Sequence, residues 1–142
     1  MPRREGMNKP WDLRERTILF SVNVIQFVRT LPHDAESAEI ASQLRRSSSS
    51  IGAHLAAAKR NKSDKDYINK ISGGIEEGDE SLYWFDVLIG AEICSEDSAR
   101  ELRAEANELV SILVASRTTA IERQARNKKL QAEKKAAAPR RM

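Results

Sequence analysis

The sequence is poor in the residues from which metal sites and catalytic centres are built. Cys94 is the only cysteine among 142 residues, which excludes an intrachain disulfide and a zinc site built from several cysteines. Neither histidine, His33 or His54, follows a glutamate by three residues, so the Glu-x-x-His ligand pairs of di-iron bundles are absent. No Gly-x-Ser-x-Gly elbow and no glycine-rich phosphate loop occur. We therefore expect no catalytic residue, no metal and no cofactor, in a protein that is not an enzyme.

Long apolar runs are also missing. No stretch approaches the roughly 18 apolar residues that are needed to cross a bilayer. The charged residues 1–6 are not followed by the apolar segment of a secretory signal. We expect a cytoplasmic protein with no membrane partner.

Positive charge is concentrated at the C-terminal end, whereas the rest of the chain is slightly acidic. Residues 117–142 hold nine Lys/Arg and two Glu, a net charge of +7, so residues 1–116 carry 15 Lys/Arg against 19 Asp/Glu, a net charge of −4. The sequence pI of about 9.2 therefore reflects the C-terminal segment. A uniformly basic nucleic-acid-binding body is not indicated.

The spacing of apolar residues predicts four amphipathic helices and no strand. Each predicted helix starts at a residue whose side chain can accept a hydrogen bond from a free backbone amide: Asp12, Asp34, Ser63 and Ser95. Short loops between long helices favour antiparallel neighbours, so the predicted fold is all-α, an antiparallel up-down-up-down four-helix bundle. We expect a flexible N-terminus (1–11), the bundle (12–122) and a basic Ala/Lys-rich tail (123–142) that is a frayed helix or disordered.

Three glycines weaken the third predicted helix. Gly73, Gly74 and Gly78 each cost about 1 kcal/mol relative to alanine in a helix interior. Two outcomes stay open at this stage. Packing outweighs the low propensity and the helix is continuous, or the helix breaks near Gly73 and Gly74.

The first predicted helix has more apolar surface than one bundle needs. One stripe includes Phe20 and Val24, and a second stripe runs through Ile18, Val22 and Ile25. A helix with two apolar stripes has one stripe left over once the first faces the core. We expect Ile18, Val22 and Ile25 to form part of an interface in a homo-oligomer.

The third predicted helix carries three consecutive aromatic residues, Tyr83, Trp84 and Phe85. Consecutive side chains on a helix point about 100° apart, so the three cannot all enter one core. If Phe85 points inward, Tyr83 and Trp84 need cover elsewhere, and we expect them at a subunit interface. The alternative is that Trp84 lies across the edge of its own bundle.

One basic cluster occurs in the body of the chain. Its candidate nucleic-acid contacts lie on the second helix and in the following turn: Arg45, Arg46, Lys59, Arg60 and Lys62. Such a cluster can contact phosphates. It can equally pair with carboxylates of the acidic stretch 76–108, within one subunit or between subunits.

Several short motifs, in a fixed order, carry a family resemblance. They are QLRRS at 43–47, SI at 50–51, R-x-x-S at 60–63 followed by DY at 66–67, and E-x-x-ESLYWF at 77–85. With an amphipathic helix before and after them, this order resembles the four-helix-bundle family of 23S rRNA-intervening sequence proteins. The resemblance implies an antiparallel bundle and a ring-like homo-oligomer, with a pentamer favoured.

The resemblance also bears on function. It implies that the role of most family members is not established. A related branch, the accessory barrel protein of diversity-generating retroelements, is basic and associates with a reverse transcriptase and nucleic acid. Because residues 1–116 carry a net charge of −4 here, we do not expect that role to transfer directly. We hypothesise a non-enzymatic oligomeric scaffold that associates with RNA or DNA; the alternative is a purely structural assembly protein that binds a protein partner.

Overall fold

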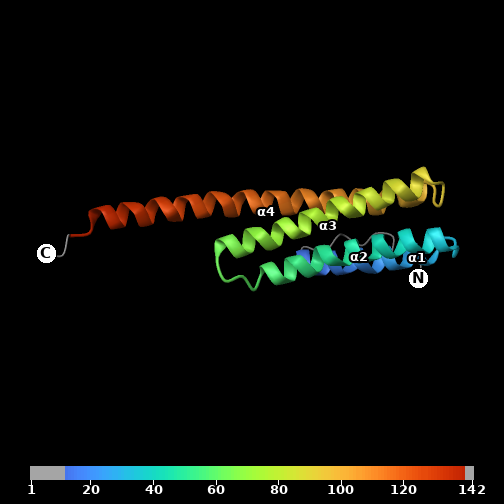
Figure 1. Cartoon of the computed structure of the whole chain (residues 1–142), viewed down its shortest axis with the longest axis horizontal. Helices are drawn as coiled ribbons and strands as arrows, with labels where there is room; N and C mark the ends of the chain where they lie inside the picture. The colour runs from blue at the N-terminus through green and yellow to red at the C-terminus, as the bar shows by residue number, and fades with distance from the viewer. Residues whose placement is uncertain (1–11, 140–142) are drawn as a thin grey trace.

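The computed structural model describes residues 12–139, so the expected flexible segment 1–11 and residues 140–142 lie outside the described part. The chain forms four helices: α1 (Leu13–Arg29), α2 (Ala35–Ala58), α3 (Asp64–Gly90) and α4 (Glu96–Ala137). Residues 12–139 contain no strand. Successive helices run in alternating directions along one another, and α4 projects beyond the others (Figure 1). The predicted all-helical four-helix fold is confirmed, and the ring-like assembly stays a prediction.

Each helix begins where the sequence predicts, because a side chain caps its first free amides. Asp12 accepts from the Arg14 amide at 2.8 Å, and Asp34 accepts from the Ser37 amide at 3.0 Å. The hydroxyls of the other two predicted caps accept from amides three residues ahead, at 3.1 Å in each case: Ser63 and Ser95. These hydrogen bonds satisfy donors that have no partner within the helix.

The core lies between the predicted inner stripes of the helices. Its largest side chains with less than 2 % exposure include Phe20, Phe85, Leu44, Ile51, Ile71, Leu88, Leu109 and Leu113. The rings of Phe27 and Phe85 pack in a tilted arrangement with centroids 6.0 Å apart, which links α1 to α3. The second stripe of α1 stays outside: Ile18 is 47 % exposed, Val22 42 % and Ile25 36 %.

The glycines of α3 are sites of close helix approach, and the helix is continuous through them. A Cβ atom at Gly73 would lie 2.5 Å from the His54 Cδ2 atom on α2. A Cβ atom at Gly78 would lie 2.3 Å from the Val110 Cγ2 atom on α4. Both distances are far below van der Waals contact, so a larger residue at either position would force the facing side chain or its helix to move. Packing therefore outweighs the low helix propensity of glycine, and no break occurs at Gly73 and Gly74.

Small polar side chains fill the crossing of α2 and α3. The buried Ser81 hydroxyl lies 2.9 Å from the Ser47 hydroxyl and 3.4 Å from that of Ser48. Ser47 also donates to the Leu44 carbonyl at 3.2 Å. Within residues 12–139, no buried side-chain nitrogen or oxygen lacks a hydrogen-bond partner. The serines therefore allow close packing and carry no penalty for unpaired polar groups.

An ion-pair cluster joins α1 to α4. The Arg16 guanidinium lies 2.7 Å from Glu105 and 2.8 Å from Glu108. The Arg16 side chain is 12 % exposed and that of Glu105 is 16 % exposed, so this contact is mostly shielded from water. The hydrogen bond to Glu105 is the main reason why the pKa of Arg16 is raised.

Candidate interaction surfaces

The turn between α2 and α3 presents exposed positive charge. Lys59, Arg60 and Lys62 are exposed and form no salt bridge within residues 12–139. Asp66 lies near Lys62, because its carboxylate accepts from the Lys62 backbone amide at 3.1 Å and is attracted by the Lys62 charge. Backbone hydrogen bonds fix the end of α2 beneath them, including that from the Arg60 amide to the Ala57 carbonyl at 3.1 Å. The Asn61 side-chain amide donates to the Ala58 carbonyl at 3.0 Å and further orders the turn. Three of the five candidate nucleic-acid contacts therefore lie together.

The other two candidates, Arg45 and Arg46, lie on α2 itself. Thirteen residues separate Arg46 from Lys59, which is about 20 Å along a helix. Arg46 lies 3.4 Å from Glu77 and also donates to Glu80. The hydrogen bond from Arg46 is the main reason why the pKa of Glu80 is lowered. Pairing with the acidic stretch, one of the two sequence-based alternatives, thus holds for Arg46, while Arg45 is exposed.

The C-terminal part of α4 extends this basic surface. Ala120 is the last buried residue of the helix. The last hydrogen bonds to α3 are those of Arg123 and Asn127 with Asp64, at 3.1 and 3.4 Å. The helix continues for ten residues beyond Asn127, about 15 Å, and projects past the α2–α3 turn (Figure 1). Its exposed cations are Lys128, Lys129, Lys134 and Lys135; with Lys59, Arg60 and Lys62 they form what we term the basic end.

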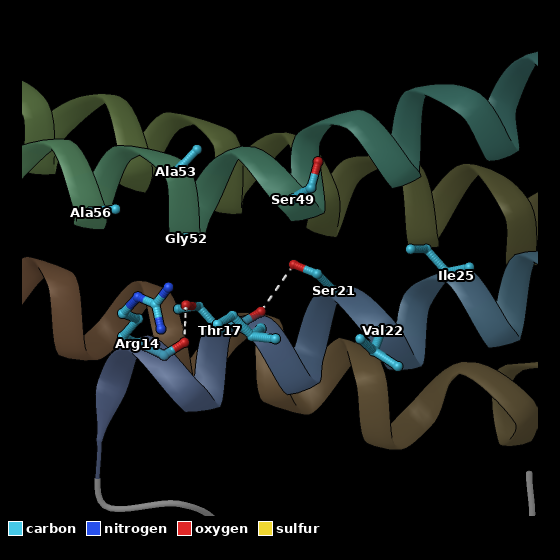
Figure 2. Close-up of a pocket in the computed structure, with 10 residues that line it drawn as sticks. Arg14, Thr17, Ser21, Val22, Ile25, Ser49, Gly52, Ala53 and Ala56 are labelled. Atoms are coloured by element: carbon cyan, nitrogen blue, oxygen red, sulfur yellow. Dashed lines mark hydrogen bonds between the residues drawn. The ribbon is translucent and has the colours of Figure 1, made fainter.

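A groove runs between α1 and α2 on the outside of the bundle (Figure 2). It has a volume of about 240 Å³, and its α1 side includes the predicted interface residues Ile18, Val22 and Ile25. The α2 side consists of small residues: Ser49, Gly52, Ala53 and Ala56. We term this feature the α1/α2 groove. Its polar atoms are largely occupied, since Ser21 donates to the Thr17 carbonyl at 2.9 Å.

The two predicted aromatic interface residues lie elsewhere, on α3. Tyr83 is 60 % exposed, and its ring meets that of Trp84 edge-on with centroids 5.1 Å apart. Trp84 is half-buried, and its indole nitrogen donates to Glu80 at 3.3 Å. Phe85 is fully buried, as the sequence predicts. Neither Tyr83 nor Trp84 lines the α1/α2 groove, so the five predicted interface residues form two separate surfaces.

His54 and Cys94, whose side chains could in principle bind a metal or act as a nucleophile, have contacts typical of structural residues. The Nδ1 atom of His54 lies 2.8 Å from the Ser50 carbonyl, one turn earlier on α2. Burial raises the pKa of the Cys94 thiol, which disfavours the reactive thiolate. In residues 12–139, no group of three His, Cys, Asp or Glu side chains is placed to hold a metal ion. None of the helices in this range is long and apolar enough to span a membrane.

Sequence reasoning missed two features of these surfaces. The small residues on the outer side of α2, such as Ala53 and Ala56, were not identified as a groove wall. Their spacing of three residues was a usable signal, because it places them on one face of α2. A second hollow, between Tyr67 on α3 and Arg123 on α4, depends on residues 56 positions apart, so only the fold brings it together.

Comparison with known proteins gives one family and one fold. The family model described as 23S rRNA-intervening sequence protein matches residues 10–115. A crystal structure of a protein of unknown function from the S23 ribosomal protein family of Bacteroides thetaiotaomicron is similar, with a TM-score of 0.67 and 24 % sequence identity. The similarity covers 72 % of this chain and 94 % of that one, and at this identity it shows the fold alone. No curated protein matches the sequence.

Proposed function

Since the chain belongs to the family of 23S rRNA-intervening sequence proteins, we propose that it is a non-enzymatic, self-associating scaffold whose basic end binds RNA. The observation that carries the proposal is the basic end itself. Its seven cations come from the α2–α3 turn and from α4, two segments far apart in the sequence (Figure 1). Within residues 12–139, none of the seven forms a salt bridge, although the charge of Lys62 attracts the Asp66 carboxylate.

The electrostatics of the basic end suit a phosphate backbone. Lysines 128, 129, 134 and 135 lie along a helical segment that nothing else in the described chain covers, so a strand can run beside them. Each neutralised phosphate releases counterions, which makes the affinity fall steeply with salt. At the opposite end, α4 begins with Glu96 and Asp97, whose carboxylates disfavour the approach of a phosphate. The charge distribution therefore orients the chain on RNA even though its net charge is only +3.

The exposed apolar stripe of α1 supports the proposed self-association. Ile18, Val22 and Ile25 are at least 36 % exposed and line a continuous groove with α2. Covering them with a second copy would remove this apolar surface from water. The family resemblance favours a ring of five copies, which would place several basic ends on one assembly. Several linked weak sites bind a long RNA much more tightly than one site does.

A second candidate function rests on the same groove. Its small α2 wall and apolar α1 wall suit a helix of another protein, in which case the chain would be a purely structural assembly protein. This alternative predicts no salt-sensitive binding of RNA. It also predicts that the 16.0 kDa chain stays monomeric in scattering experiments across a concentration series, because the partner is a different protein.

RNA binding over a salt series tests the proposal. We compare the full chain with Lys59→Gln/Arg60→Gln, and with the control Arg29→Gln/Arg100→Gln, which changes net charge equally at the opposite end. For single-stranded RNA, the slope of the logarithm of the binding constant against the logarithm of the salt concentration should become shallower by roughly 0.7 per lost phosphate contact. We expect this change in Lys59→Gln/Arg60→Gln and not in the control. Equal slopes in both variants would mean that binding follows net charge alone. Absent binding with a monomeric mass would favour the protein-partner alternative.

A further inference from the structure

A shallow hollow of about 410 Å³ lies between α3 and α4, next to the basic end. It is lined by Tyr67, Ile112, Ala115, Ser116, Thr119 and Arg123. Five of these residues fall on one stripe of α4, and Tyr67 faces them from the first turn of α3. We term this feature the α3/α4 hollow. No role proposed so far uses it.

The hollow combines an aromatic ring with a fixed planar cation. The guanidinium carbon of Arg123 lies 5.9 Å from the centroid of the half-buried Tyr67 ring. Arg123 is held in place by Asp64, whose Oδ1 atom accepts from the Arg123 Nε atom at 3.1 Å. The second oxygen of Asp64 accepts from Asn127 at 3.4 Å. The carboxylate is therefore occupied by its own chain and offers little repulsion to an anionic ligand.

The rest of the lining is small, with two hydroxyl groups. Ser116 donates to the Ile112 carbonyl at 3.0 Å, and Thr119 donates to the Ala115 carbonyl at 3.1 Å. Because both protons are used in these bonds, the free lone pairs of both oxygens can only accept. Amino groups of a heterocyclic base are donors of the matching kind. Ala115 adds only a methyl group, which leaves the space open.

We propose that the α3/α4 hollow binds an unpaired nucleobase of single-stranded RNA. This inference rests on the proposed RNA-binding function and assigns the base contact within it. A flat base can stack on Tyr67 or on the plane of the Arg123 guanidinium, which is how many proteins hold single strands. The exposed Lys62 and Lys65, just before Tyr67 in the chain, are placed to meet the adjoining phosphates. A base inside a duplex cannot enter, because its faces are already stacked.

The test compares two oligonucleotides of equal length and charge on the full chain: ten adenosines, and the same backbone with every base removed. Tyr67→Leu removes the aromatic face and keeps apolar bulk, while Tyr67→Phe keeps the face. His33→Leu removes an exposed aromatic ring between α1 and α2, at the opposite end of the bundle, and is the control. Ala115→Met fills the hollow and leaves residue 67 a tyrosine, and it serves as the test variant if Tyr67→Leu does not fold.

We expect Tyr67→Leu and Ala115→Met to weaken binding of the adenosine oligomer by roughly 5- to 150-fold, the range typical for one stacked base. Binding of the abasic oligomer should not change, and Tyr67→Phe and His33→Leu should resemble the unmodified chain. If the unmodified chain binds both oligomers equally, or if Tyr67→Leu weakens both equally, the base site is refuted while phosphate binding stands. If neither oligomer binds, both the base site and the RNA-binding proposal are refuted.

Discussion

Replacing Gly78 by alanine tests the close packing of α3 against α4. In an isolated helix this change stabilises by about 1 kcal/mol. Here the new Cβ atom would lie 2.3 Å from the Val110 Cγ2 atom. Rotating Val110 away is unfavourable, because a valine in a helix strongly prefers one rotamer. Forcing an extra methyl group into a packed site typically costs about 1–3 kcal/mol, so Gly78→Ala should lower the free energy of unfolding by up to about 2 kcal/mol.

A double-mutant cycle isolates the steric contribution. In the background of Val110→Ala the obstructing methyl groups are gone, so Gly78→Ala should now stabilise by about 1 kcal/mol. The coupling between the two changes should be about 1–3 kcal/mol. Gly90→Ala is the matched control, since its Cβ atom would have no neighbour within 4 Å; we expect it to be neutral or stabilising by up to about 1 kcal/mol.

Urea unfolding, followed by circular dichroism at one protein concentration, measures the free energy of unfolding of all five proteins: the unmodified chain, the two single variants, the double variant and the control. A fixed concentration matters because self-association would add a concentration-dependent contribution to stability. The reasoning is refuted if Gly78→Ala stabilises equally in both backgrounds, since α4 would then have room for the methyl group. If a variant changes the slope of the unfolding free energy against urea concentration and leaves the urea midpoint unchanged, the change would instead indicate an altered denatured state.

Two further predictions concern electrostatic contacts. Arg16→Ala should lower the free energy of unfolding by about 1–3 kcal/mol, because it removes the guanidinium that pairs with the mostly buried Glu105. In the same urea assay, the control Arg100→Ala, at an exposed ion pair, should change the free energy of unfolding by no more than about 0.5 kcal/mol. Equal losses of stability in the two variants would contradict a shielded contact at Arg16. The Ser37 amide lowers the pKa of Asp34 below its ordinary 3.8, so the stabilising contribution of Asp34 is present above that value and is lost as the pH falls through the lower folded-state pKa. Asp34→Asn should therefore reduce the decrease in Tm that occurs on acidification below about pH 4. If Tm falls equally with pH in the variant and in the unmodified chain, the Asp34 carboxylate does not stabilise α2 as a cap.

The sequence predicted the helices well because their causes are local. The start of α3 needs only the Ser63 hydroxyl and the Asp66 amide, three residues apart. The inner stripe of α1 could be identified from spacing alone, and so could the exposure of Ile18. The family resemblance, carried by short motifs in order, is confirmed by the match over residues 10–115.

The remaining features depend on which helices become neighbours, and spacing along one helix does not contain that information. The glycines of α3 looked like weak points because their partners, His54 and Val110, lie on other helices. The basic cluster looked like one surface, but Arg46 faces Glu77 and Glu80 across α2 and α3. Tyr83 and Ile18 were both expected at a subunit interface, and only the fold shows that Ile18 lines the α1/α2 groove and Tyr83 does not.

The projecting segment of α4 differs thermodynamically from an isolated basic peptide of the same sequence. A short helix in water is marginal mainly because its first turn must be nucleated at a large entropic cost. Here the packed part of α4, up to Ala120, already supplies that first turn. Each later residue only propagates an existing helix, which needs little free energy per residue. The lysines are therefore held at a rise of about 1.5 Å per residue. Neutralising their mutual repulsion should stabilise this helical segment against fraying, so that helical content increases when a polyanion binds.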